Sequence, residues 1–461
     1  MTQQNYNQNS FKQKYGDNII KYYEDNIQEG SLQIGNWRRG DDTQVKNFKF
    51  LEMFNITTLI IYFDNKFRLK LKNQTIKQLF VRKSINVEMN VLNLIVDDLE
   101  LENLEVLLLD SNKMCSEQLY NLTKFKKLHT LDVSFNDVDL THIHNVLSLA
   151  KLSMQRCGLK NIECISSLVN LEYLDLSVNS DIDINPLCKI TTITQLNVSN
   201  CNLHQIDQIG SLINLKVLDV SSNQLQNVDS IRYLVNLKEL NISSNYIDIT
   251  PLKYLVRLIK LSLQNCQLRQ LSALQPLICL QYLDLSYNFE IDITALQYLK
   301  NLTYLNLNYC NLVSICVLRP LVNLENFEAA ENIIVYLDAN FNNMKKLQVL
   351  RVNSNRISDI SAISIEKHPN YIQIDNSDKI CFNISQQRKP SQNELHWANK
   401  LRHIEGPNIQ LKNVQNICQT FKTTLNSLKQ QVNAVKNIIC SNQIQFTSYV
   451  IRFFQQLNQF E

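Results

Sequence analysis

Apolar and polar positions alternate in a short motif that recurs through the middle of the chain. In the stretch 215–236 (LKVLDVSSNQLQNVDSIRYLVN), the first half alternates with a period of two. This predicts a short β-strand with Leu218 and Val220 pointing inward. In the second half apolar residues recur every three positions, which predicts a 3₁₀-like turn, because residues three apart share one face of a 3₁₀ helix. Those positions are Leu225, Val228, Ile231 and Leu234.

The motif, LxxLxLxx followed by asparagine or cysteine, is repeated along the chain at intervals of 21 to 24 residues. One such unit cannot bury its apolar side alone, so neighbouring units must stack and share a continuous core. The sequence therefore predicts a repeat solenoid. The repeats begin at Leu104, Leu128, Leu149, Leu171, Ile193, Leu215, Leu237, Leu258, Leu280, Leu302, Leu324 and Leu347.

These repeats resemble the leucine-rich-repeat family, in its 22-residue subclass. The resemblance implies an α/β solenoid: a right-handed leucine-rich-repeat horseshoe with a parallel concave β-sheet and an irregular or 3₁₀ convex side. It also implies a non-catalytic scaffold that binds a protein partner on the concave face. The repeat unit is similar to that of a regulatory subunit of type-1 protein phosphatase and to expanded repeat sets of unicellular eukaryotes. Phosphatase regulation is accordingly the specific hypothesis.

The repeat pattern divides the chain into four segments. Residues 1–103 are expected to form an N-terminal cap with degenerate repeats at Ile56–Phe63 and Ile76–Lys83. Residues 104–380 form the repeat domain, including a terminal cap repeat. A linker at 381–407 then leads to a C-terminal helical segment at 408–461.

The C-terminal segment predicts a long helix or a helical hairpin. From Leu411 to Ile439 apolar residues alternate at spacings of three and four, which is typical of a coiled-coil seam. The alternative function is therefore a structural assembly protein that forms a homodimer through residues 411–453. A helix that packs on the repeats explains the same pattern.

Cysteine replaces asparagine in four repeats. The asparagine amide is both donor and acceptor, so it can satisfy buried backbone groups where the strand turns. Cysteine is small and tolerates burial. We therefore interpret these residues as structural and inert rather than as disulfides, metal ligands or nucleophiles. They are Cys157, Cys201, Cys266 and Cys310.

The strands present two sets of candidate partner-binding residues. One is an acidic column between the second and third conserved apolar positions, for which simple solvation of the exposed face is the alternative. The other is a set of aromatic residues that either anchor a partner or pack on one another across strands. The candidates are Asp132, Asp175, Asp219 and Asp284, together with Phe135, Tyr173, Tyr282, Tyr287, Tyr304 and Tyr309.

Composition narrows the function classes. The formal net charge is +3; residues 101–381 carry 23 basic and 28 acidic side chains, a distribution that disfavours nucleic acid as a partner. No phosphate-binding loop, nucleophile elbow or HExxH motif is present, so we expect no catalytic residue, cofactor or metal. The N-terminus is polar, no apolar run spans a bilayer, and the 12 cysteines lack paired CxxC spacing. These features predict a cytoplasmic protein, with the nucleus as the alternative.

Overall fold

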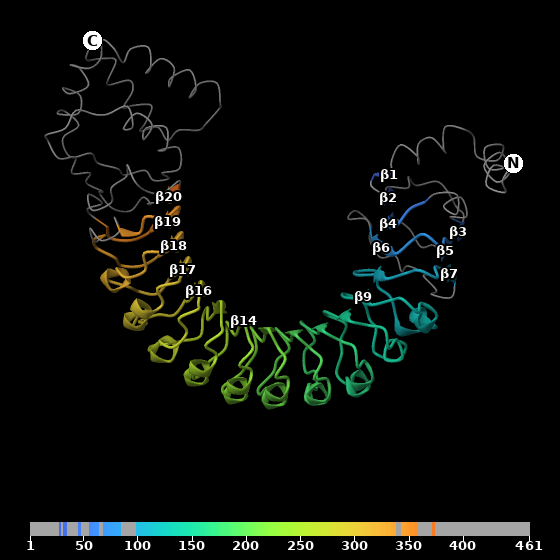
Figure 1. Ribbon diagram of the computed structural model, residues 1–461, viewed down its shortest axis with the longest axis horizontal. Coiled ribbons are helices and arrows are strands. Elements are labelled where there is room, and N and C mark those ends of the chain that lie inside the picture. Colours follow the sequence, from blue (N-terminus) through green and yellow to red (C-terminus); the bar gives the residue numbers. More distant parts are fainter. Residues whose placement is uncertain are drawn as a thin grey trace, which may run out of the picture. The chain divides into compact units, whose positions relative to one another are not determined.

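The computed structural model describes residues 27–28, 31–34, 45–47, 55–63, 68–83, 98–337, 343–357 and 371–373. The chain forms two compact units, Met1–Leu255 and Val256–Glu461. In each unit the strands line the inner side and the 3₁₀ helices line the outer side (Figure 1). The predicted linker, C-terminal helix and dimer segment lie outside the described residues.

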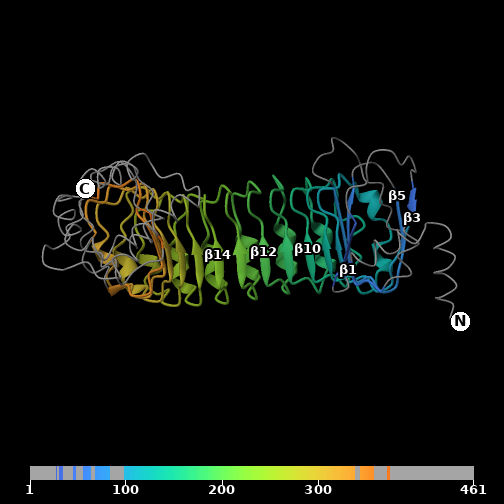
Figure 2. The same ribbon diagram turned by 90° about the horizontal axis from the view of Figure 1, so that it is seen from above.

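The first unit contains one long ladder of parallel strands. It begins with an antiparallel pair, β1 with β2, and continues in parallel through β4, β6 and β8 to β14. Figure 2 shows β10, β12 and β14 in sequence order along this ladder. The strands are β1 (Ile27–Gln28), β2 (Ser31–Ile34), β4 (Thr58–Phe63), β6 (Gln78–Lys83), β8 (Val106–Leu108), β9 (Thr130–Asp132), β10 (Lys151–Ser153), β11 (Tyr173–Asp175), β12 (Gln195–Asn197), β13 (Val217–Asp219) and β14 (Glu239–Asn241).

The opposite side of the first unit changes character along the chain. Near the N-terminus it carries a second parallel ladder, β3 (Val45–Asn47), β5 (Arg68–Lys72) and β7 (Leu99–Glu100). Further on, single turns of 3₁₀ helix take this place, as the three-residue apolar spacing predicts. They are η3 (Ser116–Leu119), η4 (Leu122–Lys124), η5 (Glu163–Ser167), η6 (Asn185–Lys189), η7 (Asp207–Ser211), η8 (Asp229–Tyr233) and η9 (Thr250–Tyr254).

The second unit repeats the same design. The six strands described in this unit pair in parallel and in sequence order, with Leu283 opposite Leu305 and Leu305 opposite Phe327. The strands are β15 (Lys260–Ser262), β16 (Tyr282–Asp284), β17 (Tyr304–Asn306), β18 (Asn326–Glu328), β19 (Val349–Arg351) and β20 (Tyr371–Gln373). The 3₁₀ helices are η10 (Ser272–Leu274), η11 (Thr294–Tyr298) and η12 (Cys316–Leu318).

The core lies between the strands and the 3₁₀ helices of each repeat. In the repeat that starts at Leu215, the inward positions Leu218 and Val220 are buried as predicted. Leu225, Val228, Ile231 and Leu234 are buried as well. Burying one such side chain contributes about 1.5–3 kcal/mol, so the regular apolar columns carry most of the stability.

The asparagine or cysteine column ties each repeat to its neighbours. The Asn179 side-chain oxygen accepts backbone N–H groups from Cys157 and Leu159, at 2.9 and 3.1 Å. Its amide nitrogen donates to the Met154 and Leu176 carbonyls, at 2.9 and 2.8 Å. The prediction that this asparagine satisfies buried backbone groups is therefore confirmed.

The residue just before this column is left-handed in one repeat after another. Its φ lies between 52° and 62°, a region that ordinary side chains rarely occupy. Because the backbone has the same shape at each of these positions, their side chains leave successive repeats in the same direction. The residues are Ser111, Phe135, Arg156, Val178, Asn200, Ser222, Ser244, Asn265, Tyr287, Tyr309, Glu331 and Ser354.

Candidate functional site

The acidic column on the strand side is bound into the backbone of its own turn. Asp175 accepts the Ser177 backbone N–H at 2.9 Å and the Ser177 hydroxyl at 2.6 Å. Asp219 binds Ser221 in the same way, at 2.9 and 2.6 Å. Ser286 binds Asp284 at 2.9 and 2.7 Å, and the Ser134 backbone donates to Asp132 at 2.9 Å. These carboxylates brace the end of each strand, and all four are half-buried.

Three of these aspartates also contact the next repeat. The side-chain amide of Asn197 donates to the second oxygen of Asp175 at 3.2 Å. The pair Asn241 and Asp219 has the same geometry at 2.9 Å, as does Asn306 with Asp284 at 3.2 Å. The column is therefore more than a solvated surface, because it links pairs of repeats. A D-x-S triplet followed 22 residues later by asparagine is the sequence signal for this link.

Four of the predicted tyrosines form two stacked pairs on the strand side of the second unit. Tyr282 and Tyr304 lie on adjacent strands, with ring centroids 4.4 Å apart and an interplanar angle of 6°. Tyr287 and Tyr309 occupy the left-handed positions, with centroids 4.5 Å apart and an angle of 10°. The separation matches the spacing of neighbouring strands, so the repeat itself sets the stack. Packing between tyrosines is thus real, while Tyr287 and Tyr309 stay 39% and 37% exposed.

A charged network borders the first tyrosine pair. Arg351 donates to Glu328 at 2.6 Å, and the Glu328 side chain is only 13% exposed. The Tyr304 hydroxyl lies 3.5 Å from the same carboxylate, and the Asn308 side chain donates to it at 3.2 Å. Burial, followed by the charge of Glu328, raises the pKa of Tyr304, so its hydroxyl stays protonated at neutral pH.

The predicted aromatic residues of the first unit do not stack as the four tyrosines of the second unit do. Phe135 is 42% exposed at a left-handed position of its own. Tyr173 is half-buried, and no aromatic ring packs against it within the described part of the chain. Burial is the main cause of its raised pKa, with a smaller contribution from Asp175. The tyrosine cluster is therefore a feature of the second unit.

The cysteines of the repeat column are buried, and their thiols are poorly ionised. Burial raises the pKa of Cys157 and of Cys310 to about 12, and that of Cys201 to about 11. The Cys201 thiol lies 3.2 Å from the Leu176 carbonyl, which it can reach as a weak donor. All four column cysteines are free thiols. Among the described residues, no group of three or more His, Cys, Asp or Glu side chains is placed to hold a metal ion.

Two further features are not predicted from the sequence. A second asparagine column, on the loops that lead into the strands, donates to the preceding repeat. Asn214 donates to the Thr191 carbonyl at 2.9 Å, and Asn301 to the Ile278 carbonyl at 2.8 Å. The other feature is Glu331, which follows Tyr287 and Tyr309 in the left-handed column. The sequence signal for Glu331 is its spacing, because it stands one repeat, or 22 residues, after Tyr309.

Comparison with known proteins agrees with this geometry. The family model "Leucine Rich repeats (2 copies)" matches residues 213–254. Those residues include strand β14 and the 3₁₀ helices η8 and η9 described above. The chain is a leucine-rich-repeat protein. No curated protein matches its sequence significantly.

Solved structures of other proteins resemble the fold of this chain. A leucine-rich-repeat protein of Leptospira interrogans is 23% identical with a TM-score of 0.56, and the match covers 70% of this chain and 82% of that one. The functional domain of InlJ from Listeria monocytogenes, which includes a cysteine ladder, is 22% identical with a TM-score of 0.51, over 67% of this chain and 64% of that one. Internalin InlF from Listeria monocytogenes is 25% identical with a TM-score of 0.48, over 57% and 85%.

Because one fold can serve many functions, the function of this leucine-rich-repeat protein must be argued from its own surface residues. Within the part of the chain that the structure describes, no helix is both long and apolar enough to cross a membrane.

Proposed function

We propose that this leucine-rich-repeat protein is a non-catalytic scaffold that binds a protein partner on the strand side of its second unit. The observation that carries the proposal is the stacked, partly exposed pair Tyr287 and Tyr309. Tyrosines that are already rigid lose little conformational freedom on binding, and tyrosine is enriched at binding hot spots.

The neighbouring residues support a polar, specific interface. Tyr282 and Tyr304 stack on one another, and the charges of Asp284 and Glu328 act on both hydroxyls, so aromatic rings and carboxylates share this surface. Interfaces of this kind combine buried aromatic anchors with a hydrogen-bonding rim.

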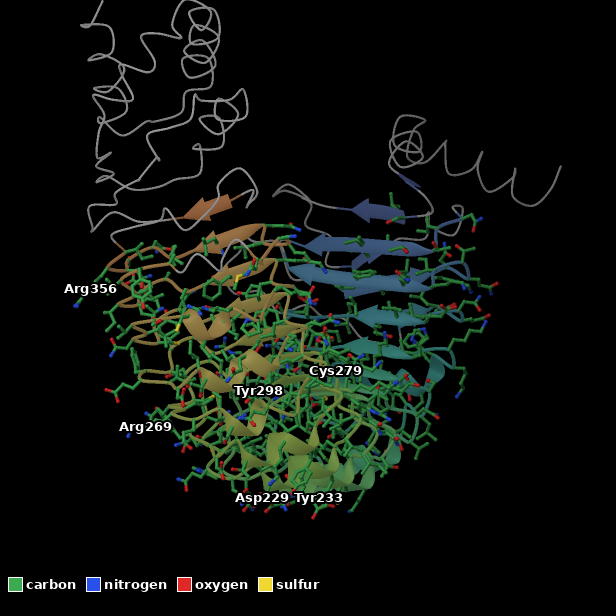
Figure 3. All side chains as sticks on the ribbon, turned by 60° about the vertical axis from the view of Figure 1, so that its left-hand side comes forward. Asp229, Tyr233, Arg269, Cys279, Tyr298 and Arg356 are labelled. Carbon is green, nitrogen blue, oxygen red and sulfur yellow. The ribbon has the colours of Figure 1, made fainter. Side chains whose placement is uncertain are left out.

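The test is affinity capture from native lysate with three full-length baits. The first is the unchanged protein. The second carries Tyr287→Ser and Tyr309→Ser. The third carries Tyr233→Ser and Tyr298→Ser, which remove exposed tyrosines of the 3₁₀ side (Figure 3). The proposal expects a partner that the first and third baits retain and the second loses. Equal capture by all three folded baits would place the interface elsewhere.

Two more specific roles follow from the sequence. The similarity of the repeat unit to that of a type-1 phosphatase regulatory subunit makes that phosphatase a defined partner to test, by direct binding of the purified enzyme. The heptad spacing of 411–453 makes homodimerisation an alternative function. Light scattering on the full chain separates them, because a monomeric mass excludes the assembly role.

A further inference from the structure

The left-handed column of the second unit runs from an aromatic pair to a carboxylate. Tyr287, Tyr309 and Glu331 have φ values of 59°, 57° and 55°. Their backbone N–H groups make the same hydrogen bond in three successive repeats, to the carbonyls of Asn308, Ala330 and Asn353, at 2.9, 3.0 and 2.9 Å. The three residues therefore stand in one row along the strand-pairing direction, about one strand spacing apart, and their side chains leave the backbone in the same direction.

The charge of Glu331 reaches the ring next to it. It is the main cause of the raised pKa of Tyr309, ahead of burial and of Tyr287. Glu331 is exposed and follows Tyr309 in the row, so the face of Tyr309 that Tyr287 leaves uncovered lies toward a carboxylate. A cation on that face would meet both the π-electrons of the ring and the negative charge.

The same unit already pairs an arginine with a carboxylate that lies beside a tyrosine. In the neighbouring column, Arg351 forms an ion pair with Glu328 at 2.6 Å, and the Tyr304 hydroxyl lies 3.5 Å from that carboxylate. Glu331 has no such cation: within the described ranges, no lysine, arginine or histidine forms an ion pair with it. The position that follows it in the row is Ser354, a small side chain.

We propose that Tyr309 and Glu331 together receive an arginine side chain presented by an extended segment of the protein partner. Arginine fits better than lysine because its planar guanidinium stacks on an aromatic ring while its edge hydrogen-bonds a carboxylate. This inference rests on the proposed function, since it names the chemistry by which the tyrosine face recognises its partner.

The test uses the full chain and a fluorescein-labelled decapeptide of alternating arginine and serine, with binding followed by fluorescence anisotropy. Matched peptides carry lysine, or the neutral isostere citrulline, in place of arginine. We expect the arginine peptide to bind most tightly, the lysine peptide less tightly, and the citrulline peptide at least about tenfold more weakly, because citrulline loses both the ion pair and the cation–π contact.

Four variants test the site itself. Glu331→Gln should weaken the arginine peptide about threefold to fivefold, and Tyr309→Leu about fivefold. Tyr309→Phe keeps the ring and should keep the affinity. Glu163→Gln removes the same charge from an exposed residue of η5 in the first unit, so it should change the affinity by less than about 1.5-fold. Circular dichroism confirms that each variant is folded.

Several results would overturn the inference. Equal binding of the citrulline peptide, or equal effects of Glu331→Gln and Glu163→Gln, would show that no arginine site exists here. A carbodiimide cross-link from Glu331 to a lysine of residues 382–461 in the monomer would show that this segment of the chain itself occupies the site. In either case a partner that still requires Tyr287 and Tyr309 in the capture experiment would leave the proposed function standing.

Discussion

The side-chain oxygen of Asn223 lies 3.0 Å from the backbone nitrogen of Cys201, which occupies the same position one repeat earlier. The same oxygen accepts the Leu203 N–H at 3.0 Å. Cys157, Cys266 and Cys310 likewise donate their backbone N–H groups to the asparagine of the following repeat, at 2.9, 3.0 and 3.0 Å. Each column cysteine is followed by an asparagine, whose side-chain oxygen accepts the backbone N–H of that cysteine.

The asparagine column should be the most sensitive polar feature of the fold. Asn223→Ala would remove the acceptor of the Cys201 and Leu203 backbone N–H groups and the side-chain donor to the Val198 carbonyl. The Val220 carbonyl would keep the Asn245 side chain as a donor. We expect a loss of about 3 kcal/mol in the free energy of unfolding, measured by urea denaturation.

A matched variant on the second asparagine column tests whether burial of the hydrogen-bonding partners sets this cost. Asn214→Ala removes one exposed hydrogen bond, to the Thr191 carbonyl, and should cost less than about 1 kcal/mol. Equal losses for Asn214→Ala and Asn223→Ala would show that burial of the partners does not set the cost.

The column thiols should resist alkylation in the folded protein. Because burial raises the pKa of Cys201 to about 11, only roughly one thiol in a thousand is ionised at pH 8, and the thiolate is the reactive form. The exposed cysteines Cys164, Cys279 and Cys316 should react first with iodoacetamide, as read by peptide mass spectrometry. Cys157, Cys201, Cys266 and Cys310 should react only after unfolding in urea. Modification of the two sets at one rate in native buffer would contradict their burial.

The ion pair between Arg351 and Glu328 should show strong coupling. Arg351→Met leaves the Glu328 carboxylate, 13% exposed, without its cation, and should lower the free energy of unfolding by about 2 kcal/mol. Glu328→Gln in the same background should recover part of that loss, because the uncompensated charge is gone. Additive effects of the two substitutions in a double-mutant cycle would mean that the pair does not interact.

Stability should fall at alkaline pH partly through Tyr304. Its pKa is raised in the folded state by burial and by Glu328, so the folded protein holds this proton more tightly than the unfolded chain. The contribution is complete below the unfolded pKa, near 10, and is lost as pH rises through the folded value. Tyr304→Phe should flatten the decrease in denaturation midpoint between about pH 9 and pH 11. Tyr298→Phe, on the 3₁₀ side, is the matched control for the loss of one tyrosine hydroxyl, and an equal flattening by both variants would contradict the role of Tyr304.

The sequence by itself determined the repeat and its buried positions. Leu218 and Val220 point inward and Leu225, Val228, Ile231 and Leu234 pack below them, because a period of two and a period of three each impose one local geometry. The structural role of the asparagine column and of Cys201 followed in the same way, from donors and acceptors at a fixed position.

Only the tertiary structure decided what the exposed positions do. Tyr287 and Tyr309 lie 22 residues apart in sequence, and stacking at 4.5 Å arises because adjacent repeats share one left-handed backbone. The sequence predicts Asp175 as a partner-binding residue or as a solvated charge, and only the tertiary structure places it within hydrogen-bond distance of Ser177 and Asn197. Periodicity fixes which face a residue occupies, whereas the orientation of a polar side chain depends on neighbours one repeat away.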